Sequence, residues 1–190
     1  MQRFPVRDAI LFTLLVGIAV ASRLLPHAPN FTALMAVGLL AAVLFSSRVL
    51  AAAVPLSAMV ISDAFIGGYD ARLMLAVYGA MLLPLLLSPI VRAKSTFAGS
   101  RLLRVGAASI VCSILFFTIT NGAVWAFGSM YESSGAGLLA CFGAAIPFFK
   151  YQLAGDLSYG LALFGVAAAL PRLLPAAASQ STPEAVAAAA

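Results

Sequence analysis

The stretch "VGAASIVCSILFFTITNGAVWAF", residues 105–127, decides the fold class. It carries no charged side chain, and a membrane-spanning helix needs about 20 consecutive apolar residues. Backbone groups in lipid must be hydrogen-bonded within their own segment, which favours a helix here. A strand of a membrane β-barrel would instead alternate apolar and polar residues over about ten positions. We therefore predict that residues 105–127 cross a membrane as a helix.

The composition of the whole chain agrees with this interpretation. Its 190 residues are 63% hydrophobic and 9% charged, whereas soluble domains are about 45–50% apolar and about 25% charged. We predict one transmembrane domain over residues 1–174 and a low-complexity tail over residues 175–190, which we expect to be disordered. The net charge of +5 does not indicate nucleic-acid binding, because Lys and Arg positions in membrane proteins record topology.

Five further apolar runs make six predicted spans in all. The predicted spans are residues 9–26, 31–45, 49–67, 73–91, 105–127 and 153–170. We therefore expect an all-α membrane protein, a bundle of six transmembrane helices. The first run contains "AVAS" at residues 19–22, which resembles a signal-peptide cleavage site, but the runs that follow favour an uncleaved span.

A shorter apolar segment, "GAGLLACFGAAIPFF" at residues 135–149, precedes the last span. Its length is typical of a re-entrant or interfacial segment rather than of a complete span. Pro147 near its end favours a break in the helix at that point. We therefore predict a short re-entrant or interfacial segment before the last span.

The cations predict the topology. With six spans and a cytoplasmic N-terminus, most Lys and Arg residues fall on the cytoplasmic side, as the positive-inside rule requires. The strongest anchor is "RAKSTFAGSRLLR", residues 92–104, directly before the opening stretch. A seventh span would weaken this asymmetry. We expect a multi-pass protein of the bacterial inner membrane with both termini in the cytoplasm.

Polar residues gather at the outer ends of the predicted spans. Polar groups inside a membrane are costly and usually face the bundle interior or a cavity. Helical spacing places Asn121 with Trp125, and Gln152 with Asp156 and Tyr159, on shared faces. We predict an outward-facing pocket that binds a small-molecule substrate. Its predicted residues are Arg23, His27, Asn30, Asp63, Asn121, Trp125, Lys150, Gln152, Asp156 and Tyr159.

Structural roles for the same residues stay open. Asp156 could pair with Arg23 or Lys150 to hold helices together, and Asn121 could hydrogen-bond a neighbouring helix. His27 lies between prolines, so an ordinary loop position is favoured over a metal ligand or a pH switch.

Sequence motifs for an enzyme are absent. The chain contains no Walker A loop, no H-E-x-x-H, no G-x-S-x-G and no G-x-G-x-x-G. Cys112 and Cys141 lie in apolar runs without metal-ligand spacing, so we expect buried free thiols. We therefore expect no enzymatic activity, no metal site and no cofactor. The alternatives to substrate capture are a proton-coupled carrier, in which Asp63 and Asp156 form a proton path, and a structural membrane protein.

Four motifs carry a family resemblance. They are "PHAPNFTALMAVGLL", "SDAFIGGYD", "TNGAVW" and "GLLACFGAAIPFFKYQLAGDLSYGLALFG". Together they run from about Arg23 to Gly165 and resemble a family of small bacterial inner-membrane proteins. That family is similar to the S components, the substrate-binding subunits, of energy-coupling factor (ECF) vitamin transporters.

The resemblance implies a function and a partner. S components are six-helix proteins that capture a vitamin or a metal from the outer side and topple in the membrane to release it. They dock on a transmembrane coupling protein with ATPase subunits through small residues of the first helix, here Gly17 and Ala21. One type takes up cobalamin and uses a cysteine on cobalt; here only Cys141 is placed to do so, and a corrinoid would be substrate rather than cofactor. We expect capture of a small, partly polar solute such as a vitamin, with cobalamin a candidate.

Overall fold

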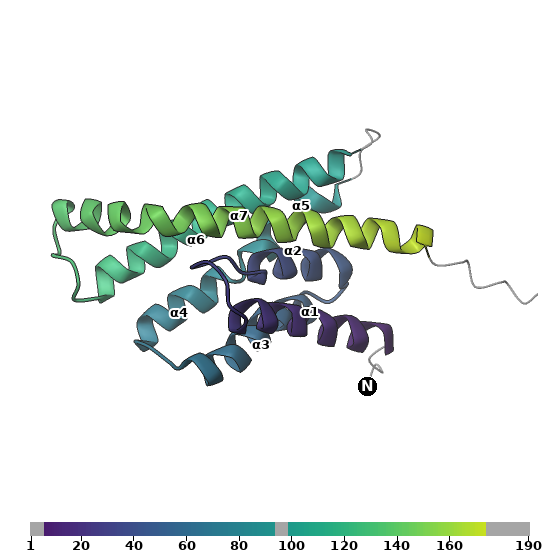
Figure 1. Cartoon of the computed structure of the whole chain (residues 1–190), viewed down its shortest axis with the longest axis horizontal. Coiled ribbons are helices and arrows are strands. Elements are labelled where there is room, and N and C mark those ends of the chain that lie inside the picture. The colour runs from purple at the N-terminus through teal and green to yellow at the C-terminus, as the bar shows by residue number, and fades with distance from the viewer. Residues whose placement is uncertain (1–5, 94–98, 174–190) are drawn as a thin grey trace, which may run out of the picture.

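The computed structural model describes residues 6–93 and 99–173. Within these ranges the chain forms helices and no strand, which confirms the predicted all-α class (Figure 1). The helices are α1 (Val6–Leu24), α2 (Leu34–Leu44), α3 (Arg48–Ile66), α4 (Ala71–Ala80), α5 (Leu83–Arg92), α6 (Ser100–Phe127) and α7 (Gly135–Leu173). The predicted tail, residues 175–190, lies outside the described residues.

Helices α4 and α5 form one interrupted rod. A turn at Met81 and Leu82 separates them, and Pro84 at the start of α5 explains the interruption, because proline has no N–H to continue the helical ladder. Taken together they form the 22-residue apolar segment Ala71–Arg92. This segment, α3, α6 and α7 are long and apolar enough to cross a membrane, by length and composition. With α4 and α5 counted as one segment, the helices occur along the chain in the same order as the predicted apolar runs.

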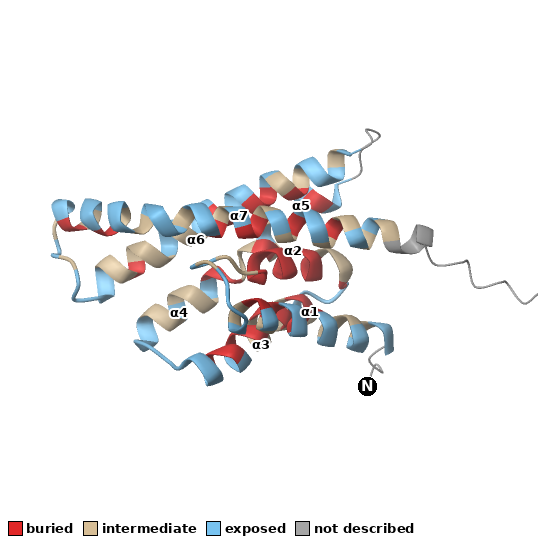
Figure 2. Cartoon of the chain, in the orientation of Figure 1, coloured by how far each residue is buried: buried red, intermediate tan, exposed pale blue. Residues whose placement is uncertain are grey.

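Helix α2 lies at the centre of the bundle. Every residue from Leu34 to Ala42 is buried (Figure 2), and α2 contacts α1, α3, α5, α6 and α7. A helix that is apolar on all sides requires such surroundings. Its 11 residues span about 16 Å, about half of the hydrocarbon thickness of a bilayer. Arg92 closes its end by donating to the carbonyls of Ala42 (3.1 Å) and Phe45 (2.9 Å).

The predicted separate segment before the last span is wrong. Residues 135–149 form the first part of α7, a single helix of 39 residues. Pro147 removes one backbone hydrogen bond, which a packed neighbouring helix can compensate. Phe117 of α6 supplies this packing, since its ring contacts Phe142 (centroids 5.5 Å apart) and Phe149 (4.7 Å) on the two sides of Pro147.

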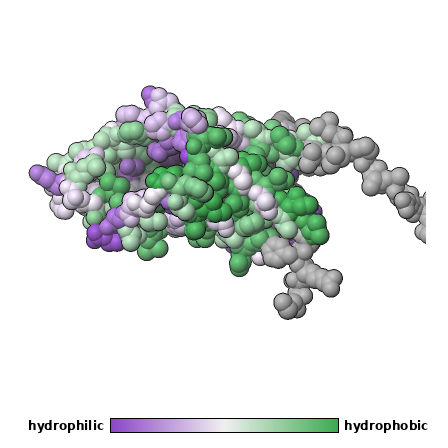
Figure 3. All heavy atoms as spheres, turned by 60° about the horizontal axis from the view of Figure 1, so that its bottom comes forward, coloured by the Kyte–Doolittle hydropathy of each residue, from purple (hydrophilic) through white to green (hydrophobic). Residues whose placement is uncertain are grey.

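The connections alternate between the two ends of the molecule. In Figure 1 the start of α1, the α2–α3 connection and the end of α7 lie at one end. The opposite end, which we call the loop end, carries residues 25–33, 67–70 and 128–134. Figure 3 shows hydrophobic surface over the middle of the molecule and hydrophilic atoms gathered toward the loop end. These features fit a membrane protein; the side that the loop end faces stays a prediction.

Gly155 of α7 sets how closely the α1–α2 loop approaches. A Cβ at this position would lie 3.1 Å from Phe31 Cα and 3.2 Å from Thr32 N. Gly155→Ala should therefore displace the loop backbone and destabilise the protein by about 1–3 kcal/mol. The effect is measured as a lower melting temperature of the protein in detergent. Gly143→Ala is the control, because a Cβ there meets no atom within 4 Å and alanine favours a helix. Equal melting temperatures would contradict this packing.

Candidate functional site

A cavity of about 330 Å³ lies toward the loop end of the bundle. Its inner boundary contains three buried methionines, Met35 of α2, Met59 of α3 and Met81 of the α4–α5 turn. Leu34 and Met35 are the first residues of α2, so the cavity begins where this short helix starts. Methionine side chains are flexible and polarizable, which suits an irregular apolar boundary.

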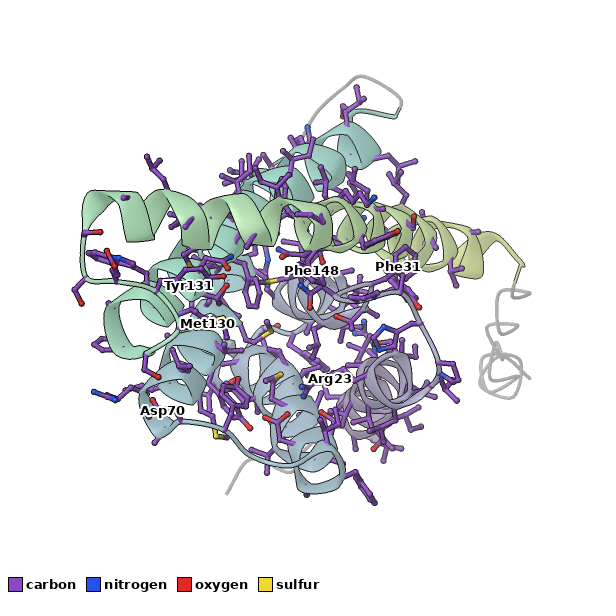
Figure 4. The ribbon with its side chains drawn as sticks, turned by 60° about the vertical axis from the view of Figure 1, so that its left-hand side comes forward. Arg23, Phe31, Asp70, Met130, Tyr131 and Phe148 are labelled. Carbon is purple, nitrogen blue, oxygen red and sulfur yellow. The ribbon has the colours of Figure 1, made fainter. Side chains whose placement is uncertain are left out.

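Aromatic side chains of α6 and α7 form a second part of the lining. Phe116 and Phe117 come from α6, and Phe148 and Phe149 come from α7. Figure 4 shows Phe148 beneath α7 and Arg23 nearer the opposite side of the bundle, with the loop end toward the viewer. The cavity therefore lies between the α6–α7 pair and the group formed by α1, α2, α3 and α4.

A polar contact joins α6 and α7 at the cavity. Ser113 Oγ lies 2.6 Å from Asp156 Oδ2 and 2.9 Å from the carbonyl of Ser109, so its one proton is shared between these acceptors. Gln152 Nε2 donates to the carbonyl of Ser113 at 3.0 Å. Gly160 permits the close approach, because a Cβ there would lie 3.0 Å from Ser109 Oγ. Among the described residues, Asp156 has no cation within ion-pair distance.

An ion pair forms the opposite side of the site. Arg23 Nη1 lies 2.7 Å from Asp63 Oδ1 and donates to Ser62 Oγ at 2.5 Å. The contact with Oδ1 is an ion pair without hydrogen-bond alignment, while Oδ2 accepts from the Tyr78 hydroxyl at 2.8 Å. These contacts join α1, α3 and α4. Arg23 thus pairs with Asp63, and the alternative pairing of Asp156 with Arg23 or Lys150 does not occur.

Tyr69 lines the cavity from the α3–α4 loop, and Asp70 and Arg72, which follow it, make polar contacts outside the lining. Burial, and then the negative charge of Asp63, raise the pKa of Tyr69, so its phenol stays protonated at neutral pH and can donate a hydrogen bond. Asp70 caps α4 by accepting from the backbone N–H of Arg72 (2.9 Å). The Arg72 side chain is the main cause of a lowered pKa of Asp70, and it reaches Phe127 of α6, with its guanidinium 5.5 Å from the ring centroid.

Five of the predicted binding residues line the cavity. They are Arg23, Asn30, Asn121, Gln152 and Asp156. They come from three helices, α1, α6 and α7, and from the α1–α2 loop. The fold therefore brings together side chains that are up to about 130 positions apart in the chain. Asp63 lies directly behind Arg23 as its ion-pair partner. Whether any of them binds a solute stays a prediction.

Four other predicted residues lie outside the lining. His27 folds back on its own loop, with ring nitrogens 2.7 Å from the Ala28 carbonyl and 3.2 Å from the Arg23 carbonyl. The Trp125 indole donates to the Glu132 carbonyl at 3.0 Å. Lys150 is exposed and lies over the Tyr151 ring, because two residues along a helix turn it about 200° away from Gln152. Tyr159 packs on Phe31, with ring centroids 5.6 Å apart.

Several lining residues were missed by sequence reasoning. Phe117 precedes Asn121 by four positions, and Phe148 precedes Gln152 by four, so helical spacing could have placed these rings on the polar faces. The three methionines carry no such signal, because they come from separate helices and turns. Cys112 and Cys141 are free and buried, as predicted. In the described part of the chain, no group of three His, Cys, Asp or Glu side chains could hold a metal ion.

The comparison with family models matches almost the whole chain. Residues 5–178 fit the model of a family described as a family of unknown function, DUF6580. The chain belongs to this family. The match includes every helix, so the cavity and the Arg23–Asp63 pair belong to the DUF6580 domain itself. No curated protein and no solved structure matched the chain. The resemblance to S components therefore stays a prediction.

The Arg23–Asp63 pair should stabilise the fold. Asp63→Ala leaves the guanidinium largely buried without its counter-charge, at a cost of about 3 kcal/mol. The double variant with Arg23→Ala should cost less than the two single changes together, with a coupling of at least about 1 kcal/mol. Helicity measured during chemical unfolding in detergent gives these values. Glu132→Ala, which removes an exposed carboxylate, serves as the control, and strictly additive losses would contradict the pair.

Proposed function

We propose that this DUF6580 protein captures a small solute for uptake across the bacterial inner membrane. The observation that carries the proposal is the cavity of about 330 Å³, in which polar side chains from separate helices meet aromatic and methionine side chains. Sites for small molecules commonly enclose about 300–1,000 Å³, with mostly apolar walls and a few converging polar groups. The cavity falls within this volume range, and its lining combines apolar side chains with several polar ones.

The size of the cavity favours a compact solute. Its volume lies near the lower limit for small-molecule sites, whereas a corrin ring with its side groups is a large ligand. Cys141, the cysteine placed by sequence to reach cobalt, is buried and does not line the cavity. We therefore narrow the proposed substrate to a compact vitamin or related micronutrient and no longer favour cobalamin.

The proposed orientation places the loop end outside the cell. The opposite end then faces the cytoplasm and carries Arg7, Arg48, Arg92 and Arg101, in agreement with the positive-inside rule. The cavity would then accept solute from the outer side. Energy would come from a partner, because the sequence contains no Walker A motif for ATP.

The proposed partner is a transmembrane coupling protein with ATPase subunits. Helix α1 packs on α2 and α3 through its buried residues Leu15, Val16 and Ala19. Gly17 and Ala21 are exposed on its outer surface, and a Cβ added at Gly17 meets no atom within 4 Å. Small residues of this kind allow a helix of another chain to approach closely.

A proton-coupled carrier is the second candidate. Asp156 favours it, because a carboxylate that is only 3% exposed and has no cation partner among residues 6–93 and 99–173 can serve a proton path. Solute uptake into cells distinguishes the two. Uptake that persists after collapse of the proton gradient and stops on depletion of ATP supports the capture subunit, and the reverse supports the carrier.

Ala145→Phe tests the cavity directly. Ala145 lines the cavity, so a phenyl group there should fill it and exclude the solute. Ala144→Phe is the matched control, because Ala144 is its neighbour on α7 but is exposed and outside the lining. Mass spectrometry of small molecules that co-purify in mild detergent should find the same solute with the wild type and Ala144→Phe, and none with Ala145→Phe. Retention by Ala145→Phe, or no enriched solute in the wild type, would count against the proposal.

Gly17→Leu tests the proposed docking surface. A larger side chain there should keep the partner helix away and lower solute uptake, while solute bound to the purified chain stays unchanged. Gly143→Leu is the control on α7, where a side chain also meets no atom within 4 Å. Unchanged uptake with Gly17→Leu, or equal loss with both variants, would argue against docking through α1.

A further inference from the structure

Three polar side chains on the α6–α7 wall each donate one hydrogen bond within the protein. Thr120 Oγ donates to the Phe116 carbonyl at 2.8 Å, and Asn121 Nδ2 donates to the Phe117 carbonyl at 2.8 Å. Gln152 Nε2 donates to the Ser113 carbonyl at 3.0 Å. Within the described residues, no donor reaches Asn121 Oδ1, Gln152 Oε1 or Thr120 Oγ. Each side-chain amide keeps a second N–H, so this wall offers a solute two amide donors together with the acceptors Asn121 Oδ1, Gln152 Oε1 and Thr120 Oγ.

The charges around the cavity do not cancel. Arg23 is neutralised by Asp63 at 2.7 Å, and Lys150 lies on Tyr151 outside the cavity. Asp156 is the remaining charged group of the lining, and among the described residues its polar partner is Ser113. A buried carboxylate without a cation is costly, so it takes up either a proton or a cation. A positively charged group of a solute would supply that cation.

The aromatic side chains of the lining also favour a positively charged group of a solute. Phe116, Phe117, Phe148 and Phe149 come from the two helices that also carry Asn121 and Asp156. The faces of aromatic rings attract cations, most strongly where water is excluded. Acceptor oxygens, an unneutralised carboxylate and aromatic rings therefore occur together on one wall.

The opposite side of the cavity offers donors instead. Arg23 and Tyr69 line it, and Tyr69 keeps its hydroxyl proton at neutral pH for the reasons given above. The first turn of α2, whose N-terminal residue Leu34 also lines the cavity, has no side-chain cap. Its first N–H groups can also serve an acceptor. The cavity is thus asymmetric in charge, with the Asp156 carboxylate on the α6–α7 side and the Arg23 and Tyr69 donors on the opposite side.

We infer that the captured solute is a compact organic cation, with a protonated nitrogen at the α6–α7 wall against Asp156 and a neutral hydrogen-bond acceptor toward Arg23. This inference rests on the proposed capture function and names its substrate class. An anionic solute would place negative charge beside the Asp156 carboxylate, which opposes its binding.

Three probes that share one ring test the inference. They are benzylammonium, benzyl alcohol and benzoate, with binding to the protein in lipid nanodiscs measured by saturation-transfer NMR. Benzylammonium should bind about tenfold more tightly than the other two, since only it carries a positive charge and can form a hydrogen-bonded ion pair with the Asp156 carboxylate. Asp156→Asn should remove this preference, so that benzylammonium binds no more tightly than benzyl alcohol. Glu132→Gln removes an exposed carboxylate instead and should change nothing.

The remaining outcomes separate this inference from the capture function. An unchanged melting temperature shows that Asp156→Asn still folds. Equal binding of the three probes, or a preference that survives Asp156→Asn, overturns the inference. A co-purified solute that is neutral or anionic at pH 7 overturns it as well but supports capture, whereas a co-purified cation supports both. A chain that binds no probe and carries no solute contradicts both.

Discussion

The long helices of the bundle surround a helix that is too short to match them. Helix α2 has 11 residues and reaches only about half as far as a membrane-spanning helix. The longer helices around it therefore enclose space beyond its first residue, and the cavity begins there, at Leu34 and Met35. The α1–α2 loop returns over this space and packs on α7 at Gly155. A full-length α2 would have filled the region that now holds the candidate site.

Polar contacts in this apolar bundle lie on opposite sides of that space. The Arg23–Asp63 pair joins α1 to α3, and the Ser113–Asp156 contact joins α6 to α7. Each contact satisfies groups that would be costly to bury alone. The first pair is electrically neutral, whereas the carboxylate of the second has no cation within ion-pair distance in the part of the chain that the structure describes. The same residues therefore stabilise the fold and give the cavity its polarity.

The sequence predicts helices and faces well because both are local properties. An apolar run is long enough to cross a membrane or it is not, and the helical period places Gln152 and Asp156 on one face regardless of their neighbours. Both residues line the cavity together with Asn121, on the other predicted face. The order of the helical segments along the chain, with α4 and α5 counted as one segment, follows from the same local information. So do the buried free thiols.

Features that depend on a neighbouring helix could not be predicted in this way. Pro147 indicates a break, but Phe117 of another helix packs on both sides of it and α7 continues. The pairing of Arg23 with Asp63 rather than with Asp156 follows from the positions of α1 and α3 in space. The three methionines meet only because α2, α3 and the α4–α5 turn converge. These contacts are set by tertiary packing, which periodicity within one helix does not contain.

The central claim is that the space beyond α2 holds a solute. The most direct test is an experimental density map of the protein purified in mild detergent from the membrane in which it naturally works. We expect density for one compact molecule between Asp156 and Arg23, in contact with Met35 and Met59. A lipid chain in that position, or side chains closed over it with no bound molecule, would contradict the account.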